Sequence, residues 1–580
     1  MLRLLACILL VWTQSALAAR LELPLRVPLE TVRDALKAQL GQVYRDGGCR
    51  YLNVDLAALD AVDGKLRLTG PGAGAFGVPL SGKCLQAIAW RGSMEILLTP
   101  RIDADGRLRV EIADSTLYDE RGGKTSPGAF VWDLSKRYVH PRLERWSYDL
   151  GASRNALAGL FTSTAAPANA APMDEVLRRL ELQTPRLEAG AVVVPLALEL
   201  PDAWLTPPSA NVSAAPLTDA EIEALEQALQ PWDAFLVYCI RQLALDNEQA
   251  EVRQRLFTLL LDSRYRMLDL LTGESRGDDA FRALFVETWN ELRATLADGR
   301  YTLFLDAGDA LAALQTAAPG LGMQMSPDGL RRLARSLRPG QSGDPLAYGW
   351  SEDPQLRDLF HVEEVRDTEP PTRSRLDFFI RPAYAEERAL DRWVPAADEL
   401  PAYETRVARL LRRTAAGEMQ QAALASPYDR IYRSLVPTTA LIESCWRQYV
   451  TRGGKVTYLR SQSGSIGIMQ INQHVWRGFY DVQKLRWSTD YNIRAGAHIL
   501  LRYVKDYAIP YAEKAGDPNV VPRAAYAVYN AGPRAVGRFA KQKPHPREQR
   551  VDDRLWLLYQ GVASGSAIDL RSCRVNPGAS

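Results

Sequence analysis

Four short stretches near the C-terminal end of this 580-residue chain carry the side chains best suited to chemistry. The first, LIESCWRQ, places one carboxylate, that of Glu443, between apolar residues on both sides. Apolar surroundings raise the pKa of a carboxyl group and keep it protonated near neutral pH, as a general acid requires. The alternative is that Glu443 faces solvent on an amphipathic helix, and this stretch alone is compatible with both.

Two further stretches could form the walls of a site around Glu443. In SGSIGIMQIN the glycines allow a ligand to approach the backbone closely, and Gln470 offers both a donor and an acceptor. AAYAVYNAGPRAV places Tyr529 and Asn530 at the end of a helix, where a tyrosine can reach a neighbouring carboxylate. A glycine turn and a core tyrosine are the structural alternatives. The fourth stretch, NIRAGAHILLRYV, predicts an amphipathic helix that is mostly structural.

Taken together and in this order, the four stretches resemble the catalytic domain of the soluble lytic transglycosylases. The family pattern is a catalytic Glu followed by Ser, then G-L-M-Q, N-I-x-x-G and A-Y-N-A-G. Here these blocks are 443–444 (ES), 467–470 (GIMQ), 492–496 (NIRAG) and 528–532 (VYNAG). The resemblance covers residues 425–570 and implies a mainly α, lysozyme-like fold for that part of the chain.

The resemblance also implies site residues. Glu443 corresponds to the catalytic acid and base, and Tyr529 would hold its carboxylate in orientation. The substrate-binding residues that it implies are Ser461, Gly467, Met469, Gln470, Tyr529 and Asn530. Further candidates are Asn472, Asp552 and Arg554, of which the last two stand near the place of the family's E-T-R-x-Y. The stretch TRGGKVTYLR, between Glu443 and the glycine-rich block, looks like an insertion relative to the family.

Glycoside cleavage by the usual route needs two carboxylates, whereas the matching blocks supply one. The resemblance implies that Glu443 protonates the oxygen between N-acetylmuramic acid and N-acetylglucosamine in peptidoglycan glycan strands. It then takes the proton of the muramic 6-hydroxyl, which attacks the anomeric carbon and leaves a 1,6-anhydro end. No metal or organic cofactor is required, and the five histidines show no ligand spacing.

Two other functions stay open at this point. A goose-type lysozyme shares the fold and the single Glu but hydrolyses with water. A non-catalytic peptidoglycan-binding envelope scaffold would use the N-terminal and middle regions instead.

Composition and the N-terminus bear on location and partners. The 71 Lys and Arg residues are balanced by 69 Asp and Glu, so nothing favours a nucleic-acid partner. Residues 1–19 combine an early Arg, a short apolar run and small residues before a possible cut. They predict a secretory signal peptide and a periplasmic protein without a lipid anchor. The sequence does not indicate an oligomeric state.

Changes in hydrophobic period predict a multidomain chain. Residues 20–205 alternate with period two, and Asp63-Gly64 and Asp105-Gly106 are hairpin turn signals, which predicts an antiparallel α+β domain. This domain faintly resembles the tubular lipid-binding domains of bacterial envelope proteins, so a lipid or an envelope protein is a possible partner. The alternative is an accessory domain that binds cell-wall material or another protein.

Helical periodicity begins after this region. Thr218 and Glu221 form a capping box at the start of an all-α middle region, residues 206–368. A linker and an approach helix follow at 369–424, then the mainly α catalytic domain at 425–570 and a tail at 571–580.

Five cysteines remain once the predicted signal peptide is removed. An oxidising compartment favours two disulfides and one leftover thiol. Neighbourhood along the chain favours Cys49 with Cys84 and Cys445 with Cys573, which leaves Cys239 on a helix. Other pairings are compatible with the sequence.

Overall fold

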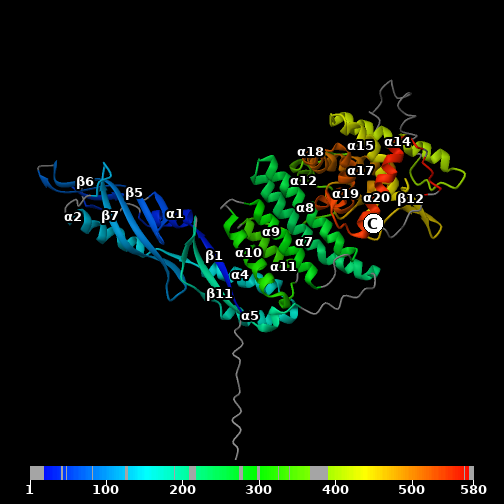
Figure 1. Ribbon diagram of the computed structural model, residues 1–580. Coiled ribbons are helices and arrows are strands. Elements are labelled where there is room, and N and C mark those ends of the chain that lie inside the picture. The colour runs from blue at the N-terminus through cyan, green and yellow to red at the C-terminus, as the bar shows by residue number, and fades with distance from the viewer. Residues whose placement is uncertain are drawn as a thin grey trace, which may run out of the picture. The chain divides into compact units, whose positions relative to one another are not determined.

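The chain forms two compact units in the computed structural model (Figure 1), and each is built from two separate segments. The first unit comprises residues 1–211 and 277–343, and the second comprises 212–276 and 344–580. The structure describes residues 19–40, 44–46, 49–55, 57–80, 83–124, 129–188, 190–207, 217–273, 278–296, 301–323, 326–338, 340–365, 390–566, 568–571 and 573. Residues 1–18 of the predicted signal peptide and the predicted linker EPPTRSR therefore lie outside the described residues.

The first unit contains the antiparallel sheet that the period-two pattern predicts. Its strand order is β2-β3-β5-β6-β7-β8, and β4 pairs with β5. The strands are β2 (Tyr44–Asp46), β3 (Arg50–Val54), β4 (Ala58–Val62), β5 (Lys65–Leu80), β6 (Lys83–Ile102), β7 (Arg107–Asp119) and β8 (Ser147–Asp149). Asp63-Gly64 joins β4 to β5 and Asp105-Gly106 lies between β6 and β7, so both predicted hairpins are confirmed.

Helices cover this sheet and a second one in the same unit. The second sheet pairs β1 (Ala19–Pro28) with β11 (Ala191–Leu200), and short strands β9 (Glu181–Leu182) and β10 (Arg186–Glu188) also pair with β11. The helices are α1 (Leu29–Leu40), α2 (Ala129–Leu134), α3 (His140–Glu144), α4 (Gly151–Thr164), α5 (Ala170–Arg178), α6 (Asp202–Leu205), α9 (Asp278–Thr295), α10 (Thr302–Ala317) and α11 (Pro327–Leu337). Helix α10 packs on β1, where the Asp306 carboxylate accepts from the Arg26 backbone N–H at 2.8 Å.

The second unit is mainly helical. It contains α7 (Asp219–Asp246), α8 (Ala250–Leu271), α12 (Pro354–Leu359), α14 (Leu400–Gln421), α15 (Tyr428–Ser444), α16 (Val482–Trp487), α17 (Thr489–Tyr503), α18 (Ile509–Ala515), α19 (Val521–Ala531) and α20 (Pro546–Ala563). The predicted capping box begins α7, where the Glu221 carboxylate accepts from the Thr218 N–H at 2.7 Å. The predicted helical middle region thus contributes helices to both units, because α7 and α8 belong to the second and α9 to α11 to the first.

Two short hairpins follow α15 in the second unit. β12 (Tyr449–Arg452) pairs with β13 (Lys455–Tyr458) through a Gly453-Gly454 turn in which both glycines have positive φ. β14 (Ser465–Ile466) pairs with β15 (Ile471–Asn472). The inserted stretch TRGGKVTYLR is therefore largely the exposed β12–β13 hairpin, and the glycine pair is what allows its tight turn.

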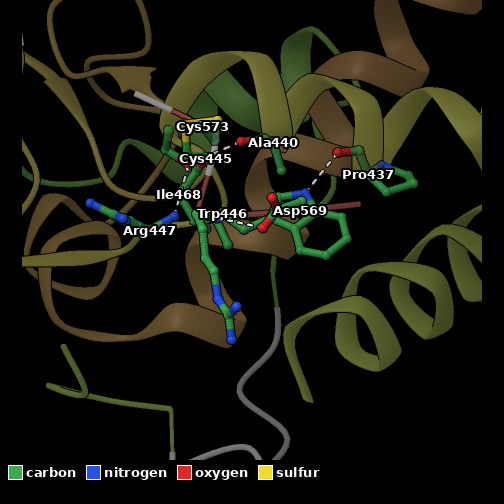
Figure 2. The surroundings of a disulfide bond; sticks show 10 residues. Pro437, Ala440, Cys445, Trp446, Arg447, Ile468, Asp569 and Cys573 are labelled. Carbon is green, nitrogen blue, oxygen red and sulfur yellow. Dashed lines mark hydrogen bonds between the residues drawn. A yellow bond between two sulfur atoms is a disulfide. The ribbon is translucent and has the colours of Figure 1, made fainter. Parts of the chain in front are cut away.

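Both predicted disulfides are confirmed. Cys49 is bonded to Cys84 in the first unit, and Cys445 to Cys573 in the second, with Cys239 free and buried in α7. Figure 2 shows Cys573 reaching the residues directly after α15, beside Trp446. In the described part of the chain, none of the helices combines the length and apolar character needed to cross a bilayer.

Candidate active site

A pocket in the second unit brings the sequence blocks together around Glu443. Its lining comes from α8, α15, the β14–β15 segment, α17 and α19. The lining residues are Tyr265, Leu268, Glu443, Ser463, Ser465, Gln470, Ile471, Asn472, Trp476, Ile499, Tyr529 and Asn530. Five of the expected site residues thus line the same pocket, although they span nearly ninety positions of the sequence. They are Glu443, Gln470, Asn472, Tyr529 and Asn530.

Glu443 lies in the last turn of α15, and local contacts explain why the helix stops there. The Ser444 hydroxyl donates to the Ile468 carbonyl at 2.6 Å, which connects the helix end to the GIMQ segment. Cys445 and Trp446 then adopt left-handed backbone with φ of 51° and 58°. Left-handed backbone is costly for non-glycine residues, so surrounding contacts must hold it.

Side-chain contacts of Trp446, Tyr403 and Cys573 hold this turn, and Figure 2 shows Trp446, Pro437 and the disulfide. The Trp446 indole N–H donates to the Pro437 carbonyl at 2.9 Å (Figure 2). The Trp446 carbonyl accepts from the Tyr403 hydroxyl at 2.7 Å. The Cys445–Cys573 disulfide adds a covalent restraint. Glu443 is therefore presented by a helix end that is fixed on several sides.

The electrostatic surroundings bring the Glu443 carboxyl group close to half-ionised at neutral pH. Desolvation raises its pKa from an ordinary 4.5 to about 7, and three groups act in the opposite direction. The Tyr526 hydroxyl donates to Oε1 at 2.9 Å, and the positive charges of Arg538 and Arg554 favour the carboxylate. A carboxyl group in this state can both give and take a proton.

The structure corrects the contact expected of Tyr529. Its hydroxyl donates to the Met469 carbonyl at 2.7 Å, while Tyr526 binds the Glu443 carboxylate. The two tyrosines are three residues apart on α19 and therefore on the same helix face, and it is the Tyr526 hydroxyl that contacts the carboxylate. That spacing was visible in AAYAVYNAG, and it is the signal that identifies Tyr526.

The GIMQ block is shaped by two buried amides. The Gln448 side chain accepts from the Ile468 N–H at 2.7 Å, and the Asn492 side chain accepts from the Met469 N–H at 2.9 Å. Gly467 has a φ of +76°, and a Cβ there would collide with both amides. The Met469 side chain is fully buried and packs against Gly496, so only its backbone serves the site.

One side of the pocket is polar, and it includes Gln470 and Asn472. Gln470 lines the pocket and donates to the Gly467 carbonyl at 2.7 Å. The expected substrate-binding residue Ser461 is not part of the pocket lining, and its hydroxyl lies 2.9 Å from that of Ser463, which is. Asn472 donates to the Ser463 carbonyl at 2.8 Å.

Asn530 and Asp552 share a partner that the sequence did not indicate. The buried Arg538 guanidinium donates to Asn530 Oδ1 at 2.9 Å and to Asp552 Oδ1 at 2.7 Å. Asp552 is nearly inaccessible, so the expected site residue forms a buried ion pair with Arg538 and does not face the pocket. Arg554 is exposed and acts on Glu443 through its charge.

Helix α8 contributes two lining residues, Tyr265 and Leu268, that the sequence motifs do not include. The Tyr265 hydroxyl donates to the Tyr529 carbonyl at 3.0 Å, and Leu268 presents a half-buried apolar side chain to the pocket. Gly532 makes room for the Tyr265 ring, because a Cβ on that glycine would lie 2.7 Å from the ring. No local signal points to these residues, since α8 lies far upstream in the chain.

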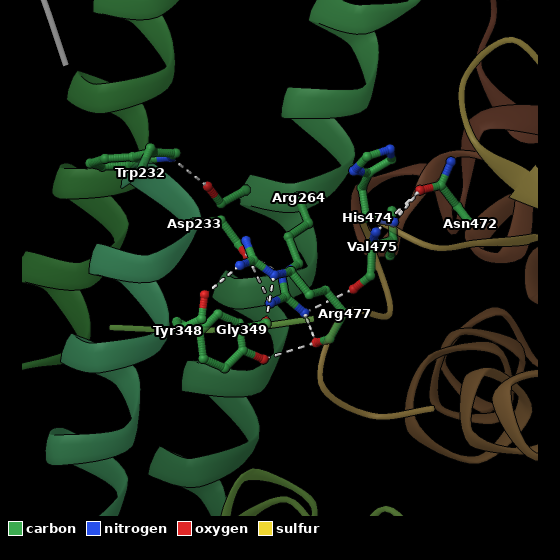
Figure 3. A network of polar contacts seen from close by, with 10 residues as sticks. Trp232, Asp233, Arg264, Tyr348, Gly349, Asn472, His474, Val475 and Arg477 are labelled. Atoms are coloured by element: carbon green, nitrogen blue, oxygen red, sulfur yellow. Dashed lines mark hydrogen bonds and ion pairs between the residues drawn. The ribbon is translucent and has the colours of Figure 1, made fainter. Parts of the chain in front are cut away.

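A buried ion network ties α7 and α8 to the pocket (Figure 3). The Asp233 carboxylate on α7 accepts from Arg264 at 2.7 Å and from Arg477 at 3.0 Å. Arg264 also donates to the Val475 carbonyl at 3.0 Å, and the Val475 N–H donates to the Asn472 side chain at 3.2 Å. The network thereby fixes the loop that carries Asn472.

Comparison with protein families identifies the class of domain that this site belongs to. Residues 424–551 match the Transglycosylase SLT domain, at the C-terminal position that the motifs indicated. Members of this family are lytic transglycosylases, so the match supports an enzyme that acts on peptidoglycan. Helices α7 and α8 lie outside the matched residues. Comparison with curated proteins and with solved structures gives no significant match.

Proposed function

We propose that this protein is an exported peptidoglycan lytic transglycosylase in which Glu443 is the single acid and base. It cleaves the β-1,4 bond between N-acetylmuramic acid and N-acetylglucosamine and forms 1,6-anhydromuramic ends. The observation that carries the proposal is the raised pKa of the Glu443 carboxyl group in the pocket. Glu443 is the only carboxylic acid among the described lining residues, and desolvation raises its pKa to about 7.

The first step uses the protonated form of Glu443. The Tyr526 hydroxyl binds Oε1, which leaves the other carboxyl oxygen to donate a proton to the glycosidic oxygen. The bond between that oxygen and the anomeric carbon breaks, and the N-acetylglucosamine side leaves with the proton. A neutral carboxylic acid is the required starting state, and the raised pKa supplies it at neutral pH.

The second step uses the carboxylate that the first step leaves behind. It takes the proton of the muramic 6-hydroxyl while that oxygen bonds to the anomeric carbon. The sugar's own acetamido group would stabilise the cationic intermediate in place of a second carboxylate. Glu443 ends protonated again, and no water is consumed. Arg538 and Arg554 favour the transient carboxylate, which keeps both steps accessible.

The mixed lining of the pocket suits a sugar polymer. Ser463, Gln470 and Asn472 offer hydroxyl and amide groups to the sugar's polar edge. Leu268 and Ile471 offer apolar surface to its carbon-bound hydrogens and acetamido methyl. Two disulfides also favour an oxidising compartment, which supports export to the periplasm after removal of the signal peptide.

Product analysis tests this function. Purified peptidoglycan is digested with the wild-type chain and with Glu443→Gln, and the muropeptides are examined by mass spectrometry. We expect anhydro products from the wild type, each lighter by one water than the hydrolytic product, and none from the variant. Hydrolytic ends would instead indicate a goose-type lysozyme. Equal binding without turnover by either protein would indicate a scaffold.

A further inference from the structure

A second pocket of the same unit is lined in part by the residues that directly follow Asn472 of the Glu443 pocket, and it has a volume of about 780 Å³. We propose that it is an additional subsite for the glycan strand, with Trp350 as a stacking platform for a neutral N-acetylhexosamine. The proposal rests on the proposed activity on peptidoglycan. Trp350 and the α7 residue that contributes to this pocket, Glu226, both lie outside the residues that match the family.

One segment of the chain contributes to both pockets. Asn472 lines the Glu443 pocket, and the next two residues, Gln473 and His474, line the second one. Consecutive Cα atoms are about 3.8 Å apart, so residues that lie only a few ångströms apart along the backbone contribute to both linings. Figure 3 shows how close Asn472 and His474 lie on this loop.

Trp350 is both accessible and held in place. It is 38% exposed, which is unusual for a large aromatic side chain. The Arg477 guanidinium lies 4.5 Å from its ring centroid, and the His474 ring meets it edge-on at 5.4 Å. The remaining accessible ring surface can pack against the carbon-bound hydrogens of a sugar.

Contacts of Arg477 make this platform rigid before any ligand arrives. Its guanidinium donates to the Gly349 carbonyl at 3.0 Å and to the Tyr348 carbonyl at 2.6 Å, which fixes the two residues before Trp350. It is itself anchored by Asp233 at 3.0 Å. A rigid platform loses little conformational entropy on binding, which favours affinity.

The polar groups around the ring favour a neutral sugar. Gln473 and Ser351 offer amide and hydroxyl groups, and the Glu226 and Glu352 carboxylates can accept from sugar hydroxyls. The lining carries three carboxylates, those of Glu226, Glu352 and Asp481, and one guanidinium, that of Arg486. This excess of carboxylates disfavours an anionic ligand. Glu226 is held in place by His474, whose Nε2 is 3.2 Å from its carboxylate.

The test compares Trp350→Ala with a matched control, Trp393→Ala, in the full chain. Trp393 is a half-buried tryptophan of the same unit, with Arg406 over its ring at 5.4 Å and Tyr403 edge-on at 5.3 Å, and it is outside this pocket. Initial rates are measured on purified glycan strands of two lengths, a tetrasaccharide and a long strand. Loss of an aromatic platform corresponds to about a tenfold drop in kcat/KM, carried by KM.

We expect that drop for Trp350→Ala on the long strand only, partial recovery in Trp350→Phe, and no change in Trp393→Ala. Equal losses on both strand lengths, or the same loss in the Trp393 control, would overturn the subsite. Binding of the long strand is also measured in the Glu443→Gln background, with and without Trp350→Ala. A wild-type chain that forms no anhydro ends refutes the proposed function, whereas undiminished long-strand binding by the double variant refutes only the subsite.

Discussion

Replacing Glu443 by Gln should change how the stability of the second unit depends on pH. Burial raises the pKa of this carboxyl group from an ordinary 4.5 to about 7, so the folded state binds the proton more tightly than the unfolded state. The stabilisation from that proton is fully present below pH 4.5 and is lost as the pH rises through about 7. Glutamine has nearly the same shape and does not titrate.

The magnitude follows from the two pKa values. Each pKa unit corresponds to about 1.4 kcal/mol, so the wild type should lose about 2 to 3 kcal/mol at this site between pH 5 and pH 8. The free energy of unfolding of Glu443→Gln, taken relative to the wild type, should rise by that amount over the same range. Desolvation also raises the pKa of Asp262 to about 7, but Asp262 is present in both proteins and cancels in the comparison.

Equilibrium urea unfolding at pH 5, 6, 7 and 8 measures this difference. The Cys239 thiol is free and fully buried in α7, so its accessibility to a thiol reagent reports on the second unit separately. A stability difference between the two proteins that stays constant from pH 5 to pH 8 would refute the reasoning, because it would mean that Glu443 titrates with an ordinary pKa.

Three further substitutions probe the surroundings of Glu443. Tyr526→Phe removes the hydrogen bond that lowers the pKa of Glu443. For a bond of about 1 kcal/mol, the alkaline limb of the kcat/KM profile should move to higher pH by somewhat less than one unit. An alkaline limb at the wild-type pH would contradict this contact. Asp233→Asn leaves two buried guanidinium groups without their carboxylate. Urea titrations should show a loss of about 3 to 5 kcal/mol in the free energy of unfolding. A loss below about 1 kcal/mol would argue against the network. Leu268→Ala should raise KM by about three- to tenfold, because the sugar loses apolar contact. Val252 is a half-buried residue of the same helix outside the pocket lining, so Val252→Ala should leave KM unchanged.

Local signals in the sequence predicted much of this structure. The Asp63-Gly64 turn and the Thr218 capping box each depend on a few adjacent residues, so neither needs knowledge of the tertiary fold. The C-terminal domain was identifiable because its four blocks occur in a fixed order, although each block is weak alone.

Long-range packing was not predictable in the same way. Helical periodicity shows that α7 and α8 have apolar faces but not which partner covers them, so their place in the second unit could not be derived. Tyr265 reaches the pocket only because Gly532, more than two hundred residues later, leaves room for its ring. The pairing of Arg538 with Asp552 likewise depends on how α20 is placed.

The choice between Tyr526 and Tyr529 shows a different limit. A family motif marks Tyr529, but the motif does not say which atom its hydroxyl contacts. The two side chains are three positions apart on one helix face, and only the structure shows that Tyr526 contacts Glu443 while Tyr529 contacts Met469. Helix spacing would have placed both tyrosines toward the site.

Cleavage of purified peptidoglycan in water enriched with oxygen-18 tests the central claim most directly. If the muramic 6-hydroxyl attacks the anomeric carbon with Glu443 as its base, the new muramic ends carry no label and are 1,6-anhydro sugars. Glu443→Gln should then form no new ends of either kind. Oxygen-18 at the anomeric position of the new muramic ends would show that water is the nucleophile and would contradict the account.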